Sequence, residues 1–159
     1  MQTHLVYGGG MTTSRPCSIA DALGMIGEKY SLLVLREVFF GVRRFDAIAR
    51  NTGAPRDILA ARLRRLVEVG VLEKSLYNER PPRFEYVATA AGRDLRPVLL
   101  MLMHWGDQHL TDLPPTVFEH SCGADLDPAV VCRDCGEEVR STDLTARFQV
   151  PGWSTEGAA

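Results

Sequence analysis

Four side chains near the C-terminus have the types and spacing of a metal site. His120 and Cys122 form a first pair, Cys132 and Cys135 form a second, and a glycine follows the last cysteine of each pair. Glycine at such a corner lets backbone N–H groups turn toward a thiolate sulfur. Three thiolates and one imidazole would complete a tetrahedral Zn²⁺ site with no open position, which is typical of structural and not of catalytic zinc.

Two other interpretations of the second pair remain open. Cys132 and Cys135 also have the CxxC spacing of redox-active dithiols, or both thiols could be inert. The chain lacks the βαβ surroundings that a thiol oxidoreductase needs, and in a cytosolic protein this spacing favours a metal over a stable disulfide. We therefore predict a small zinc-ribbon-like appendage with a structural zinc ion at residues 116–148.

Cys17 stands apart from these pairs, directly before Ser18, which is the predicted N-cap of the first helix. A thiol near a helix N-terminus can have a lowered pKa and a more reactive thiolate. Cys17 is therefore a candidate redox-sensing residue. A small buried residue that only fills space is the simpler interpretation.

Basic residues are concentrated in the middle of the chain, although the whole chain carries a formal net charge of −2. Residues 36–96 carry thirteen Lys or Arg against eight Asp or Glu, whereas residues 97–159 carry three against ten. Nucleic-acid binding depends on the local basic surface and not on the charge of the whole chain. Twelve of the thirteen are arginine, which favours forked contacts to phosphates and base edges. A solvated helical face is the alternative.

Residues 55–69 have the pattern of an amphipathic helix that ends before Gly70. Leu59, Leu63 and Leu66 repeat at the spacing of one buried face. The opposite face carries small residues and arginines, which would let the helix approach a polyanion closely. This pattern predicts a DNA-recognition helix.

The stretches on either side of this helix complete a motif. Residues 43–53 predict a short helix that ends in a glycine-containing turn, so two helices form a helix-turn-helix pattern. Apolar residues then alternate through residues 71–87, with a turn at 78–82 because consecutive prolines cannot continue a ladder. This β-hairpin, with an arginine on each side of its tip, would form the wing of a winged helix-turn-helix.

The N-terminal residues of a recognition helix reach base edges first. Arg56, Asp57, Ala60 and Ala61 are therefore the predicted base readers, with Arg56 the best able to fork onto a guanine. For Arg62, on the inner flank, we expect a surface salt bridge. Contacts to the DNA backbone are predicted for Arg64, Arg65, Arg43 and Arg44. Arg80 and Arg83, at the tip of the hairpin, could enter an adjacent minor groove.

Long apolar segments flank the motif. Residues 18–40 predict a long core helix, or two helices with a break near Gly27. Residues 90–110 predict a last helix capped by Thr89, in which Pro97 marks a kink or a break. This helix is apolar almost all round and must be buried on both sides, so we predict a homodimer; a deep core helix of a monomer is the alternative. The predicted dimer interface consists of Leu95, Val98, Leu99, Leu102 and Trp105.

The predicted fold class is mainly α with a β-hairpin wing (α+β). We expect a flexible leader at residues 1–16, a winged helix-turn-helix and dimerisation domain at 17–112, the Cys/His module at 116–148 and a flexible tail at 149–159. The chain has no apolar run long enough for a bilayer and no signal-peptide pattern, so we expect a cytoplasmic protein with no membrane partner. It has no phosphate-binding loop or Ser/His/Asp group, so we expect no enzyme.

Residues 17–109 resemble the HxlR-type bacterial regulators, which are relatives of the MarR-type winged helix repressors. The matching stretches are CSIADALGMIGEKYSLLVLRE, RRFDAIA, LAARLRRLVEVGVLE, YNERPPRFEYVATAAGRDL and HWGDQH. The resemblance implies a homodimer that binds double-stranded DNA at a pseudo-palindromic operator, which we expect to act as a repressor. It also implies that a cysteine at the position of Cys17 senses oxidants or quinones in some members. GEKY at 27–30 departs from the pattern, where a second glycine and a tryptophan would be expected.

Two further points are left open by the resemblance. A small-molecule effector would need a pocket, for which Tyr30, Phe39, Met101 and Trp105 are candidates, although plain core packing is the simpler interpretation. The alternative function is a winged-helix and zinc-ribbon interaction module that contacts the transcription machinery and not an operator.

Overall fold

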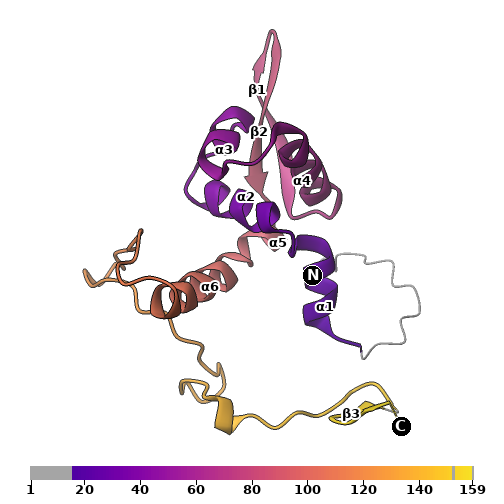
Figure 1. Cartoon of the computed structure of the whole chain (residues 1–159), viewed down its shortest axis with the longest axis vertical. Helices are drawn as coiled ribbons and strands as arrows, with labels where there is room; N and C mark the ends of the chain where they lie inside the picture. The colour runs from indigo at the N-terminus through magenta and orange to yellow at the C-terminus, as the bar shows by residue number, and fades with distance from the viewer. Residues whose placement is uncertain (1–15, 152, 159) are drawn as a thin grey trace. The chain divides into compact units, whose positions relative to one another are not determined.

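The computed structural model describes residues 16–151 and 153–158. The chain forms two compact units, one up to Arg96 and the other from Pro97 onward (Figure 1). The boundary between the two units falls at the start of the last long helix, which the sequence grouped with the winged helix. The predicted domain bounds stay a prediction. The predicted leader falls, except for residue 16, outside the described residues.

Four helices open the first unit: α1 (Ser18–Ile26), α2 (Lys29–Phe39), α3 (Phe45–Thr52) and α4 (Arg56–Glu68). The segment 18–40 is thus two helices with a break after Ile26, the second of the two predicted arrangements. The predicted N-cap was one residue late. Cys17 has the extended backbone of the N-cap, with φ −150°, and Ser18 is already helical.

The core of the first unit lies between α2, α3 and α4. Leu59, Leu63 and Leu66 of α4 are fully buried, which confirms the predicted inner face of that helix. Leu35 of α2 and Ile48 of α3 are equally buried. Burial of each such side chain stabilises the fold by about 1.5–3 kcal/mol. This packing fixes the angle at which α4 is presented.

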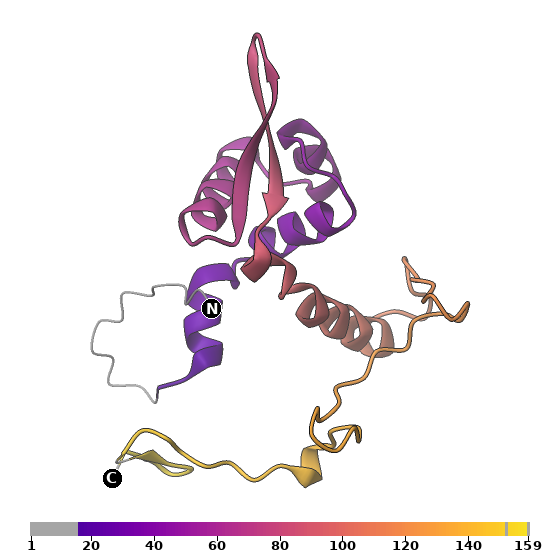
Figure 2. The same cartoon turned by 180° about the vertical axis from the view of Figure 1, so that it is seen from behind.

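The first helix departs from the prediction of a core helix. Ile19 and Leu23 of α1 are 70% and 57% exposed, and Ile26 is the buried residue of this helix. Figures 1 and 2 show α1 leading away from the helices α2–α4. Within the first unit, Ile19 and Leu23 of α1 are therefore left exposed by the described residues.

The predicted hairpin is present as β1 (Leu72–Glu79) and β2 (Pro82–Ala88), an antiparallel pair whose tip extends beyond α3 and α4 (Figure 2). The strands run closer to the tip than expected. Glu79 pairs with Pro82, so the turn is only Arg80 and Pro81, joined by a cis peptide bond. Proline is accommodated here because the pair is the last of the ladder.

A short helix, α5 (Ala90–Arg93), follows the hairpin, and its predicted cap is confirmed: the Thr89 hydroxyl accepts a hydrogen bond from the backbone N–H of Gly92. The Thr89 hydroxyl in turn donates to the Gly70 carbonyl at 2.6 Å. Gly92 is buried against the Val71 carbonyl, where a Cβ atom would collide. These contacts join the end of the wing to the end of α4.

The second unit contains little regular structure apart from α6 (Arg96–His109). The helical segment 90–110 is broken just before Pro97, the second of its predicted arrangements. Further along lie a short 3₁₀ helix (Ser141–Asp143) and the paired strands β3 (Trp153–Ser154) and β4 (Gly157–Ala158), the latter in the predicted tail. Among the described helices, none has the length and apolarity needed to cross a membrane.

Candidate DNA-binding surface

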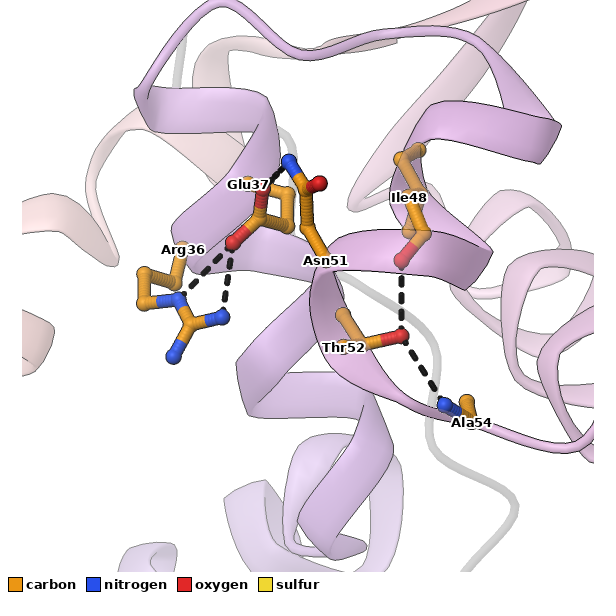
Figure 3. Close-up of polar contacts among 6 residues, drawn as sticks. All are labelled: Arg36, Glu37, Ile48, Asn51, Thr52 and Ala54. Atoms are coloured by element: carbon orange, nitrogen blue, oxygen red, sulfur yellow. Dashed lines mark hydrogen bonds and ion pairs between the residues drawn. The ribbon is translucent and has the colours of Figure 1, made fainter.

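A buried carboxylate fixes the first helix of the helix-turn-helix motif against α2. Glu37 is only 3% exposed, and both of its oxygens are used (Figure 3). The Arg36 guanidinium donates two hydrogen bonds to one oxygen, at 3.0 and 2.7 Å, and the Asn51 amide donates to the other at 2.8 Å. Because Asn51 lies at the end of α3, this contact holds the start of the turn in place.

The turn itself is ordered by a threonine and a glycine. The Thr52 hydroxyl donates to the Ile48 carbonyl at 2.7 Å and accepts from the backbone N–H of Ala54 at 3.3 Å (Figure 3). Gly53 has φ 64°, a left-handed conformation that glycine adopts without strain. The turn therefore delivers the chain directly into α4.

The outer face of α4 is as the sequence predicted. Asp57, Ala61, Arg64 and Arg65 are exposed, and Ala60 is half-buried at the edge of that face. Small side chains between arginines would let the helix backbone approach a DNA groove closely, with the guanidinium groups within reach of phosphates. Arg62 has the expected structural role, since it forms an ion pair with Glu28 at 3.5 Å.

Arg56 is held by α3. Its Nη1 lies 2.8 Å from an Asp46 carboxylate oxygen, and its guanidinium stacks over the Phe45 ring with 4.9 Å to the centroid. Both members of the ion pair are highly exposed, at 70% and 77%. An exposed ion pair of this kind contributes about 0–1 kcal/mol to stability. A DNA group could therefore replace Asp46 as the partner of Arg56 at little cost.

The arginines ahead of α3 are tied to the wing. Arg43 forms an ion pair with Glu85 at 3.7 Å, and its carbonyl accepts a hydrogen bond from the Tyr86 N–H. Arg44 stacks over the Tyr77 ring at 4.5 Å. Burial raises the pKa of the Tyr86 phenol above its ordinary value. The base of the hairpin is thus anchored to the start of the helix-turn-helix motif.

An open groove of about 590 Å³ lies between α3 and the hairpin. Arg50, in the last turn of α3, was not among the predicted contact residues, but it lines this groove and is exposed. Arg50 belongs to the basic segment 36–96, so the sequence offered it as a candidate DNA contact. Its position beside the wing depends on the fold and could not be predicted. The residues that line the groove are Arg44, Phe45, Asp46, Ala47, Arg50, Tyr77, Arg83 and Phe84.

Two predicted contact residues lie at the free end of the hairpin. Arg80 is in the turn and Arg83 pairs with Asn78 across the ladder, and both arginines are exposed. A bulge between Leu76 and Asn78 shifts the register just below them. A bulge increases local strand twist, so it affects the direction in which the tip points.

Three of the four cysteines predicted to do chemistry are exposed, and Cys132 is half-buried. Cys17 is exposed, which contradicts the interpretation of a small buried residue. His120 Nδ1 lies 3.3 Å from the Cys122 sulfur. Backbone N–H groups of Cys135 and Asp134, and the Cys135 thiol, hydrogen-bond to the Cys132 sulfur and lower its pKa. Within residues 16–151 and 153–158, no group of three or more metal-binding side chains is close enough to hold an ion. The zinc site stays a prediction.

Three of the five predicted dimer residues are more than half exposed in this structure. Val98, Leu102 and Trp105 of α6 are 54%, 52% and 54% exposed, and Leu95 and Leu99 are half-buried. No residue of α6 is buried in this structure. The homodimer and the deep core helix of a monomer both stay predictions.

Comparison with known proteins gives consistent matches. The sequence pattern of the HxlR-like helix-turn-helix family matches residues 25–113. The uncharacterized HTH-type transcriptional regulator Rv3095 of Mycobacterium tuberculosis is 47% identical over 131 residues, which cover 80% of this chain and 83% of Rv3095. A match of this length extends beyond the winged helix on at least one side.

Solved structures agree with the sequence matches. The crystal structure of PA1607, a proposed transcription factor, matches with a TM-score of 0.73 at 31% identity. The match covers 82% of this chain and 94% of the PA1607 chain. The redox regulator HypR in its oxidized form has a TM-score of 0.54 at 27% identity, over 61% of this chain and 100% of HypR. The matches are to transcriptional regulators, so the alternative of an interaction module is not favoured.

Proposed function

Because this chain belongs to the HxlR-like helix-turn-helix family of DNA-binding transcriptional regulators, we propose that it binds a pseudo-palindromic operator as a homodimer and represses transcription. The observation that carries the proposal is the outer face of α4, where small residues and arginines are exposed over a fully buried leucine face. A family of regulators gives no reason to expect catalysis, and we propose a cytoplasmic location beside the DNA.

Base reading is assigned to the start of α4 and backbone contact to its surroundings. Arg56 stands at the first helical position, where a recognition helix reaches base edges. Arg64 and Arg65 extend along the same exposed side, and Arg44, Arg50 and Arg83 line the groove beside the wing. Contacts to phosphate set the register of the complex, whereas the few contacts to base edges set its specificity.

A second copy of the chain is the proposed cover for two apolar surfaces. The α6 surface consists of Val98, Leu102 and Trp105, which follow one another at i, i+4 and i+7 on one side of the helix. Ile19 and Leu23 form a similar exposed pair on α1. Monomeric proteins rarely expose contiguous apolar patches of this kind, and two-fold dimers are the commonest way of covering them.

Footprinting tests the operator. Purified full-length protein on the DNA around its own gene should protect a discrete inverted repeat, with half-site centres about 10 base pairs or a multiple of that apart. Protection that spreads evenly along the DNA, or covers one half-site only, would contradict the proposal.

Sedimentation velocity tests the dimer. The protein should sediment at twice the 17.6 kDa mass of the chain, and Leu102→Arg should shift it to the monomer. Gln108→Arg adds the same side chain at an exposed polar position of α6 and should leave the dimer intact. A dimer that survives Leu102→Arg would exclude α6 from the interface.

Thiol oxidation is the proposed signal. Cys17 is exposed at the N-cap of α1, so an oxidant has direct access to its sulfur, and the similar structure of HypR is that of a redox regulator. Operator release on treatment with a quinone or peroxide should be lost in Cys17→Ser. Release that persists in this variant would exclude Cys17 as the sensor and leave Cys122, Cys132 and Cys135 as the remaining thiols.

A further inference from the structure

Two turns in the C-terminal unit are built in the same way. In the first, Glu119 pairs with Asp125 as an isolated antiparallel bridge, and the His120 N–H donates to the Ala124 carbonyl at 2.8 Å. In the second, Val131 pairs with Glu138, and the Cys132 N–H donates to the Glu137 carbonyl at 2.9 Å. Each turn is thus a closed hairpin with a metal-binding side chain just inside its bridge.

The tips of the turns match as well. Gly123 and Gly136 directly follow the second metal-binding residue, with φ 86° and 77°. Each glycine N–H donates back across its turn, to the His120 carbonyl at 2.8 Å and to the Cys132 carbonyl at 2.7 Å. The two tips therefore close in a similar way, and the second is one residue longer than the first.

Each turn brings two metal-binding side chains together. The His120 imidazole and the Cys122 sulfur are in direct contact at 3.3 Å. In the second turn, Cys132 and Cys135 lie three residues apart on one tip, which the Gly136 N–H closes by donating to the Cys132 carbonyl at 2.7 Å. Imidazole nitrogen and thiolate sulfur are the ligands that Zn²⁺ prefers in structural sites.

Nothing apolar holds these turns. None of the described residues from Pro97 onward is buried, and Val130 and Val131 beside the second turn are 51% and 53% exposed. A segment of about 40 residues without a core usually needs a metal, disulfides or a partner to fold. Residues 97–159 also carry ten acidic side chains against three basic ones, which favours a cation.

We propose that the two turns bind one Zn²⁺ ion through His120, Cys122, Cys132 and Cys135, and that the ion closes residues 118–139 into a folded module. The two pairs are half-sites, because no described group of three such side chains is yet together, and the ion draws them into one tetrahedron. Each of the three thiols loses its proton to solvent when its sulfur binds the ion, and the histidine binds as neutral imidazole.

Metal analysis tests this without reference to DNA. Full-length protein purified under reducing conditions should contain one zinc per chain, and replacement by Co²⁺ should produce thiolate-to-cobalt charge-transfer absorption. Cys122→Ser and Cys132→Ser should weaken zinc binding by more than about 100-fold, which exceeds the loss expected for a residue that only orients a ligand. Cys17→Ser is the matched control and should keep the metal, since Cys17 lies outside both turns.

Limited proteolysis gives a second readout. Removal of zinc with a chelator should open residues 118–139 to cleavage and leave the winged helix intact. Absence of zinc, loss of zinc in Cys17→Ser, or full zinc binding in Cys122→Ser or His120→Asn would each overturn the two-turn site. A disulfide between Cys132 and Cys135 in the reduced preparation would do so too. Operator binding measured in parallel keeps a failure of this site distinct from a failure of the proposed function.

Discussion

The winged helix and the C-terminal turns are held in opposite ways. Leu63 of α4 is fully buried among the leucines of the first unit, whereas Leu144 in the second unit is 67% exposed. The first region therefore has its geometry set by packing and needs no ligand. The second region has turns closed by a few backbone hydrogen bonds, and we expect its geometry to depend on what binds to it. A DNA-recognition helix benefits from a packed core, because its side chains are then positioned before DNA binds.

The largest predicted change in the free energy of unfolding comes from a substitution in the packed core of the first unit. Leu63→Ala should lower the free energy of unfolding by about 2–5 kcal/mol, because it removes buried contacts and leaves a cavity. Urea unfolding followed by circular dichroism measures this loss. Leu144→Ala is the counterpart in the second unit and should stay within about 0.5 kcal/mol of the parent protein. Equal losses at the two positions would mean that the second unit has a core after all.

A smaller loss is expected at the one buried carboxylate among the described residues. Glu37→Ala removes the acceptor of the Arg36 fork and of the Asn51 amide, so it should lower the free energy of unfolding by about 1–3 kcal/mol. The same urea titration measures it. Glu68→Ala, at the exposed end of α4, should have almost no effect. If the two variants unfold alike, α3 does not depend on the Glu37 contacts.

The packed region was also the region that the sequence predicted well. The spacing of Leu59, Leu63 and Leu66 alone predicts that they share one face of a helix. Gly53 and Gly70 predict the ends of helices, because glycine adopts the positive φ found at both positions. Ile19 and Leu23 have the same spacing yet are exposed, because periodicity shows that a face is apolar and not which chain covers it. The Glu37–Asn51 contact joins residues fourteen apart and left no pattern to detect.

The sequence predicts which residues belong to the candidate DNA-binding surface, but not which of them contact one another. That the arginines of α4 face outward follows from the leucine face, and the exposed Arg64 and Arg65 confirm it. That Arg56 lies against Asp46, or that Arg50 lines a groove beside the wing, depends on how α3 packs on its neighbours. Such contacts arise between elements, so the sequence of one element does not carry them.

Two arginines of α4 should separate specificity from general affinity while leaving stability unchanged. Arg56→Ala should cost about 1–3 kcal/mol of operator binding and relax the preference at one base pair. Arg65→Ala should weaken all DNA sequences alike and reduce the salt dependence by about one phosphate contact. Fluorescence anisotropy with operator and scrambled DNA at several salt concentrations measures both. Thermal unfolding is the control, and a drop in stability would show that the packed region had been disturbed.

The smallest predicted effect concerns the ion pair that occupies Arg56. Asp46→Asn removes the carboxylate that competes with DNA for this guanidinium, so operator affinity should rise by up to about fivefold, the limit set by the 0–1 kcal/mol of an exposed pair. Asp57→Asn removes the same charge one residue beyond Arg56 without touching the pair. In an Arg56→Ala background the gain from Asp46→Asn should disappear, whereas any gain from Asp57→Asn should persist. If Asp46→Asn weakens binding instead, then Asp46 orients Arg56 for DNA, and the exposed surface is preorganised as firmly as the buried one.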